Sequence, residues 1–107
     1  MEQKVRVLAN LLDDKQAEDI EIYDLDATHP MFDTVIVASV AVARNLDAII
    51  NEIKKKEKES LLEVKNYDVD NKEWILIDLF DVLVHVFIRE SRAHYDIDSI
   101  LKMYEQK

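Results

Sequence analysis

Two runs of apolar residues, at positions 74–77 and 82–88, constrain the fold of this chain more than any other feature. Nearly every position in both runs is apolar, and only residues 78–81 separate them. A strand that alternates polar and apolar residues can face water on one side, whereas a continuous apolar strand is typical of one covered on both faces. The pattern therefore predicts two central strands of a sheet that is flanked by helices.

The rest of the chain supplies the other elements of such a sheet. The spacing of apolar residues predicts helices over residues 3–14, 41–59 and 90–104. Strands are predicted over residues 18–25, 34–39 and 61–65, with a loop at 27–31 and a turn at 67–72. The first connection between strands is short for a crossover, while the long helix can carry a right-handed one. We expect an α/β fold with a mixed β-sheet of about five strands flanked by helices, in a single domain over residues 1–107.

Charge and composition exclude several classes of protein. The formal net charge is −9, and nucleic-acid binding proteins need a basic patch. The lysines at positions 54–58 are interrupted by acids and are typical of a solvated helix end. No apolar run approaches the roughly 18 residues of a membrane span, and the N-terminus lacks the apolar core of a signal peptide. We therefore expect a cytoplasmic protein whose main partner is a basic protein, not a nucleic acid or a membrane.

The chain contains no cysteine and no glycine. Without cysteine there is no thiolate metal site and no cysteine nucleophile, and without glycine there is no Gly-rich phosphate loop. Turns that need a positive φ must then use other residues. We expect them at Asn or Asp in the predicted breaks, namely Asp13, Asp14, Asn66, Asp70, Asn71 and Asp81.

Two acidic motifs resemble metal sites. Asp24 and Asp26 have the D-x-D spacing that holds a divalent metal in nucleotidyltransferases, but the Gly-Ser phosphate grip of such enzymes is missing. Residues 68–73 begin like a calcium loop, yet Glu73 stands where the sharp turn of that loop requires glycine. We expect a turn there, and no metal, cofactor or catalytic residue in the chain. A minimal nucleotidyltransferase that uses Asp24 and Asp26 is kept as the alternative.

Single histidine and tryptophan residues leave more than one interpretation open. His29, His85 and His94 share no metal-ligand spacing. His85 alternates with apolar residues on one strand face, which favours a hydrogen-bonded histidine of the core or of a surface patch over a ligand or a base. Trp74 either covers the core or exposes part of its ring as an interface anchor.

Four segments of the chain carry the motifs of one known family with their spacing. The first is Leu12-Asp13-Asp14-Lys15-Gln16-Ala17-Glu18-Asp19-Ile20, and the second joins Asp33 and the strand to Ser39 with Ala43-Arg44-Asn45-Leu46. The third and most specific comprises Trp74, Leu76, Asp78, Asp81, Val82, Val84, His85, Val86 and Phe87, and the last comprises Glu90, Arg92, Tyr95, Asp96 and Ile97. On these residues the chain resembles the ribosomal silencing factor family, also called Iojap-like. It departs from the family pattern at Val40 and Phe80 (each in place of a glycine), at Ile88-Arg89 (in place of His-Pro) and at Leu101 (in place of a Trp).

The resemblance implies a fold similar to nucleotidyltransferases without their catalytic residues. It also implies a non-enzymatic factor that binds a basic protein of the large ribosomal subunit at the subunit interface. Such a factor sterically blocks joining of the small subunit and represses translation, and the family is further associated with large-subunit biogenesis and with homodimers. The partner-binding residues expected on this basis are Trp74, Leu76, Asp78, Phe80, Asp81, His85, Arg92 and Tyr95. A general dimeric scaffold with no ribosomal role is the other alternative.

Overall fold

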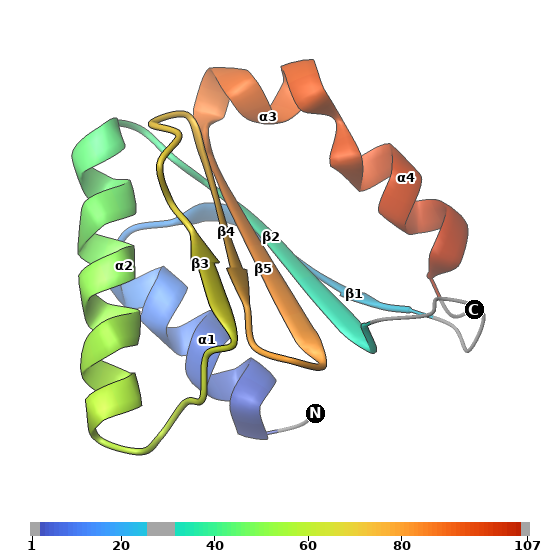
Figure 1. The fold of residues 1–107 in the computed structure, drawn as a ribbon. Helices are drawn as coiled ribbons and strands as arrows, with labels where there is room; N and C mark the ends of the chain where they lie inside the picture. The colour runs from blue at the N-terminus through green and yellow to red at the C-terminus, as the bar shows by residue number, and fades with distance from the viewer. Residues whose placement is uncertain (1–2, 26–31, 106–107) are drawn as a thin grey trace.

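A computed structural model of the chain describes residues 3–25 and 32–105 (Figure 1). The elements in chain order are α1 (Gln3–Asp14), β1 (Glu18–Asp24), β2 (Thr34–Val40), α2 (Ala43–Lys58), β3 (Asn66–Asp68), β4 (Trp74–Asp78), β5 (Val82–Ile88), α3 (Arg89–Tyr95) and α4 (Ile97–Tyr104). The strands form one five-stranded sheet in the order β1-β2-β5-β4-β3. The pair β2–β5 is parallel and the other pairs are antiparallel. The predicted α/β fold with a mixed, helix-flanked sheet is therefore confirmed.

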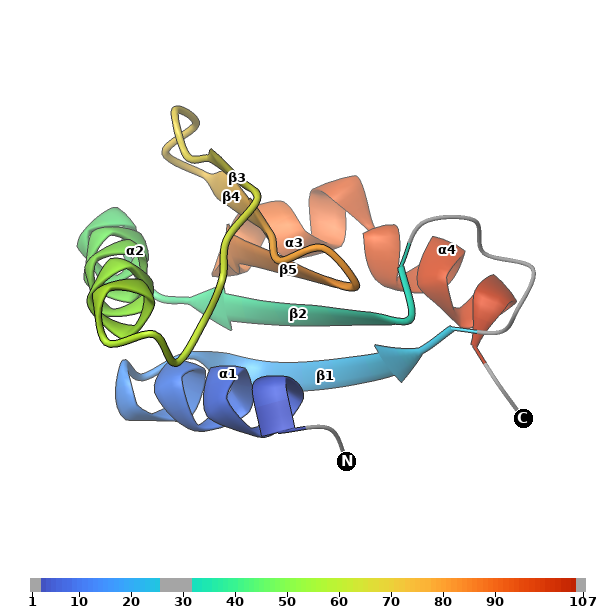
Figure 2. The same ribbon diagram turned by 60° about the horizontal axis from the view of Figure 1, so that its bottom comes forward.

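The helices form two layers, one on each face of the sheet (Figure 2). On one face α1 and α2 pack against the sheet over the larger core cluster, which includes Leu8, Leu12, Ile36, Ile53 and Val84. On the other face α3 and α4 pack over a smaller cluster, which includes Tyr23, Val37, Phe87 and Leu101. Among the described helices, none is long and apolar enough to cross a membrane. The central strand β5 is buried except at the half-buried Leu83 and Ile88, so both of its faces are largely covered, as its apolar run predicts.

The neighbouring strand β4 departs from that prediction. Its residues alternate between half-buried and buried, with Ile75 and Ile77 in the larger core. Trp74, Leu76 and Asp78 point to the other face, where α3 and α4 lie toward β2 and β1 and leave the β3–β4 side less covered (Figure 1). A continuous apolar run is therefore a misleading guide here, because Trp74 and Leu76, which the pattern alone assigns to a core, border a half-open surface.

Two predicted boundaries are also wrong. Residues 61–65 do not form a strand. Instead β3 begins at Asn66 and runs into the predicted turn, because its pairing with β4 aligns Asn66 with Asp78. Leu62 is buried without joining the sheet, so its apolar character reflects packing and not strand pairing. The predicted helix over 90–104 is two helices, because Asp96 adopts a left-handed conformation with φ 49°.

The positive-φ positions differ from those predicted. In the described residues they are Gln16, Asp19, Ser60, Phe80 and Asp96. Gln16 and Ser60 follow the ends of α1 and α2, where a left-handed residue, most often glycine, usually ends a helix. The path of the backbone therefore decides which positions have a positive φ. In this glycine-free chain those positions are occupied by Gln, Ser and Phe as well as Asp.

Candidate functional site

The half-open part of the sheet, on the side of α3 and α4, is the candidate site. We define this open face by Asp68 of β3, by Trp74, Leu76 and Asp78 of β4, and by Leu83 of β5. Cross-strand pairing places Asp68 beside Leu76 and Asp78 beside Leu83. Period-two alternation along each strand then directs these side chains to the same face. The result is an apolar strip with two carboxylates at its border: Asp68 lies beside Leu76, and Asp78 lies at the end of β4.

An aromatic cluster holds Trp74 at the border between the open face and α3. Its ring centroid lies 4.9 Å from that of Phe87, in a stacked arrangement, and 4.8 Å from that of Tyr95. Phe87 is fully buried, whereas 39% of the Tyr95 surface is exposed. Aromatic pairs of this kind contribute roughly 0.5–1.5 kcal/mol each beyond their burial. Trp74 thus packs against the core and also borders the surface. The sequence left open whether it covers the core or exposes part of its ring, and the structure shows both.

His85 supports Trp74 from within the sheet. The Trp74 indole Nε1–H donates a hydrogen bond of 3.0 Å to His85 Nδ1, and only 7% of His85 is exposed. Burial lowers the pKa of His85 to about 4, although the nearby Asp98 carboxylate acts in the opposite direction. The imidazole is therefore neutral at physiological pH, and its Nδ1 accepts the hydrogen bond from the indole N–H. The predicted hydrogen-bonded histidine is confirmed, and its burial makes it a support for Trp74 more than a direct contact for a partner.

The turn between β4 and β5 lies at the far end of β4 from Trp74. The Phe80 backbone N–H donates a 2.9 Å hydrogen bond to Asp78 Oδ1, and Phe80 is 48% exposed with φ 75°. Asp81 pairs with Lys4 of α1. The structure therefore separates the predicted site residues, since Phe80 and Asp81 belong to this turn and not to the aromatic cluster.

Arg92 has a structural role within the fold. Its guanidinium donates hydrogen bonds to both Asp98 carboxylate oxygens at 3.2 and 3.0 Å, to the Asp19 carbonyl at 2.6 Å and to Ser39 Oγ at 3.0 Å. Burial alone would raise the pKa of Asp98, but the hydrogen bonds from Arg92 and Tyr23 outweigh it and hold that pKa below its usual value. Arg92 thereby ties α3 and α4 to the sheet, which leaves little of its side chain for a partner.

Asp68 of the open face, and Asn71 in the connection between β3 and β4, were not among the predicted site residues. With Trp74 and Leu76 they line a hollow of about 250 Å³. The sequence indicates only a turn at these positions, because the apolar pattern does not reveal how β3 pairs with β4. That Asp68 lies near Trp74 and Leu76 becomes apparent only from the strand register, which sets Asp68 opposite Leu76.

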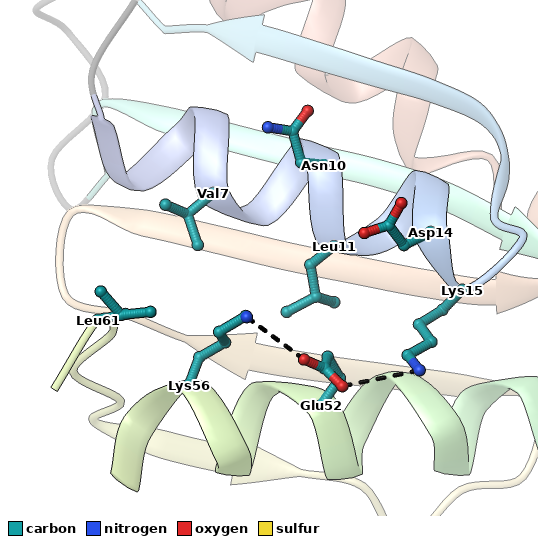
Figure 3. Close-up of a pocket in the computed structure, with 8 residues that line it drawn as sticks. All are labelled: Val7, Asn10, Leu11, Asp14, Lys15, Glu52, Lys56 and Leu61. Atoms are coloured by element: carbon teal, nitrogen blue, oxygen red, sulfur yellow. Dashed lines mark ion pairs between the residues drawn. The ribbon is translucent and has the colours of Figure 1, made fainter. Parts of the chain in front are cut away.

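A second hollow, of about 310 Å³, lies on the opposite face of the sheet, between α1 and α2 (Figure 3). Val7, Leu11 and Leu61 form its apolar walls. Across it the Glu52 carboxylate pairs with Lys15 Nζ at 3.7 Å and with Lys56 Nζ at 3.5 Å. These charges satisfy one another and link the two helices, so the hollow is a helix junction and the open face remains the better candidate.

The predicted metal alternative finds little support among the described residues. Asp24 is exposed at the end of β1, and Asp26 lies outside the described residues. Among the residues that the structure describes, no cluster of three or more His, Cys, Asp or Glu side chains could hold a metal ion.

Comparison with known proteins identifies the relatives of this chain. A family model described as "ribosomal silencing factor during starvation" matches residues 1–107. The ribosomal silencing factor RsfS of Bacillus subtilis is 33% identical over 97 residues, which cover 90% of this chain and 82% of the relative. The chloroplast protein Iojap of Arabidopsis thaliana is 26% identical over 91 residues, or 85% of this chain and 38% of that longer protein. A crystal structure of a Chromobacterium violaceum protein superposes with a TM-score of 0.85 and 29% identity, covering 100% of this chain and 90% of the other.

The fold and these relatives define a non-enzymatic regulator of translation. The chain belongs to the ribosomal silencing factor (RsfS) family, also called Iojap-like. Family membership confirms the resemblance seen in the four sequence segments. It also sets aside the alternative of a minimal nucleotidyltransferase that uses Asp24 and Asp26.

Proposed function

We propose that this ribosomal silencing factor binds a basic protein of the large ribosomal subunit through its open face and so blocks joining of the small subunit. The observation that carries the proposal is the half-buried position of Trp74 and Leu76 on a sheet face that α3 and α4 leave partly open. Interface anchors are typically aromatic residues at the centre of an apolar strip with a polar rim. Trp74, Leu76 and Tyr95 supply that strip, and Asp68 and Asp78 supply acidic groups at its rim.

The distribution of charge favours a basic partner for this side of the molecule. The helices α1 and α2, on the opposite face, carry seven basic and five acidic residues. The remainder of the chain carries seven basic and eighteen acidic residues. The net negative charge of the protein therefore lies outside α1 and α2, in the part of the chain that includes the open face, and this excess favours a positively charged protein over nucleic acid as the main contact.

Inhibition by this factor requires bulk and no chemistry. The described domain measures 34 × 33 × 22 Å along its principal axes. A body of that size, attached where the two subunits meet, excludes the other particle over an area comparable to a standard protein interface. Repression of translation then follows from occupancy of the large subunit. We also propose that the same contact assists large-subunit biogenesis, and that both activities take place in the cytoplasm.

Co-sedimentation with purified bacterial ribosomal subunits in a sucrose gradient tests the proposal. We expect the protein in the large-subunit fraction and its depletion from joined ribosomes. Trp74→Ala should weaken binding by about 2 kcal/mol or more, the usual range for an interface hot spot. Leu61→Ala is the matched control, because Leu61 is 53% exposed and borders the helix junction on the opposite face.

Thermal melting of each variant separates binding from folding. Truncation of a fully buried tryptophan costs about 3–5 kcal/mol of stability, and the half-buried position of Trp74 predicts a smaller loss. Equal recovery with both subunits, or with neither, contradicts the proposal. So does a folded Trp74→Ala variant that binds the large subunit as well as the unmodified protein does.

A further inference from the structure

The hollow beside Trp74 has the shape and chemistry of a site for one side chain. It has a volume of about 250 Å³ and is lined by Asp68, Asn71, Trp74 and Leu76. Two of these residues come from β4, one from β3, and Asn71 from the connection between these strands. The hollow therefore exists because β3 ends at Asp68 while β4 begins only at Trp74.

The apolar walls of the hollow are fixed before any ligand arrives. Trp74 is held by stacking on Phe87, by contact with Tyr95 and by its hydrogen bond to His85. Leu76 lies in the paired part of β4, opposite Asp68. A ring that is already immobilised loses little further conformational freedom on binding, which favours affinity.

The polar end of the hollow carries a negative charge that the fold does not use. Asp68 is exposed, and within the described part of the chain its carboxylate makes no side-chain hydrogen bond or ion pair. Asn71 is oriented by a 2.7 Å hydrogen bond that its Oδ1 accepts from the Glu73 backbone N–H. The same connection also contains Asp70 and Glu73, against the single Lys72, so the local potential is negative.

We propose that this hollow binds a cationic side chain of the protein partner, with arginine favoured over lysine. The inference rests on the proposed function, which supplies a basic partner at the open face. A guanidinium can stack on the indole of Trp74 and at the same time donate to the Asp68 carboxylate, whereas an ammonium lacks the planar fork needed for both. The aliphatic stem of the same side chain contacts Leu76. An uncharged apolar side chain would instead cover Asp68 without pairing its charge.

The first arm of the test uses small compounds as probes of the isolated protein. The chain has one tryptophan, so the Trp74 indole N–H gives a single resonance in a ¹H–¹⁵N spectrum. N-acetyl-arginine amide should shift this resonance in a saturable way. N-acetyl-citrulline amide, which has nearly the same shape without the charge, should have no such effect at equal concentration, and N-acetyl-lysine amide should bind more weakly than the arginine compound. Asp68→Asn should weaken binding of the arginine compound about tenfold.

The second arm measures affinity for purified large ribosomal subunits. Asp68→Asn should weaken the affinity about tenfold or more. Asp70→Asn removes the same charge two residues further along, in the connection between β3 and β4 and outside the hollow, and should weaken the affinity less than twofold. Melting temperatures should be close to that of the unmodified protein for both variants, because neither side chain is buried in the core.

The two arms distinguish failure of this inference from failure of the proposed function. The cation site is overturned if the citrulline and arginine compounds act alike, or if Asp70→Asn weakens subunit binding as much as Asp68→Asn does. It is also overturned if the arginine compound has no effect while Trp74→Ala still abolishes subunit binding, and the proposed function then stands. If the unmodified protein ignores the large subunit but binds the arginine compound through Asp68, the proposed function fails and the cation site stands.

Discussion

Acidification should weaken this fold through the protonation of His85. Burial lowers the pKa of His85 from 6.5 to about 4, so the unfolded chain takes up this proton at a higher pH than the native protein does. The stability linked to His85 is therefore fully present above about pH 6.5 and is lost as the pH falls toward 4. Each pH unit between the two pKa values corresponds to about 1.4 kcal/mol, so the loss amounts to about 2 kcal/mol at pH 5 and about 3 kcal/mol at pH 4.

Urea unfolding followed by far-ultraviolet circular dichroism between pH 4 and pH 7.5 measures this effect. The informative quantity is the difference between the unmodified protein and His85→Gln, because the carboxylates that titrate in the same range are common to both. The variant can keep a hydrogen bond to the Trp74 indole, and it should lose about 3 kcal/mol less than the unmodified protein over this range. His94→Gln is the control for the substitution itself, since His94 is exposed and takes no part in the hydrogen bond between Trp74 and His85. Parallel profiles for the unmodified protein and His85→Gln would refute the reasoning.

Three further predictions concern the turn, the Arg92 network and the partner contact. Phe80→Gly should have a free energy of unfolding about 1 kcal/mol higher than Phe80→Ala, because glycine adopts φ 75° without the steric cost that any other residue has there. Urea titration of both variants measures this difference, and equal stabilities would contradict the prediction. Arg92→Lys should lower the stability by about 2 kcal/mol, since lysine cannot reproduce the paired hydrogen bonds to Asp98. A urea midpoint equal to that of the unmodified protein would contradict this prediction. Binding to the large subunit should weaken with salt yet persist at moderate ionic strength, because screening removes the steering by charge and leaves the apolar anchors; a loss as steep as that of a many-phosphate contact, measured by co-sedimentation across salt concentrations, would point to RNA.

Local pattern was sufficient for the central elements. The apolar run over 82–88 predicts β5, and the periodic stripe of Leu46, Ile49 and Ile53 predicts α2, because each element buries a face that its own sequence defines. The same logic fails at β3, where three residues with little apolar character pair only because β4 lies beside them. It also fails at Asp96, since a single left-handed residue divides a periodic stretch into two helices without changing its composition.

The resemblance of four sequence segments to a known family was enough to indicate the class of this protein. The absence of cysteine and glycine excludes thiolate sites and Gly-rich phosphate loops, and the spaced motif from Trp74 to Phe87 resembles that of the ribosomal silencing factors. The roles of individual site residues came instead from contacts in three dimensions. Burial makes His85 a support for Trp74, and the hydrogen bonds of Arg92 to Asp98 make it a link between helix and sheet. These roles depend on distances between residues far apart in the chain, which the local pattern of a single sequence does not encode.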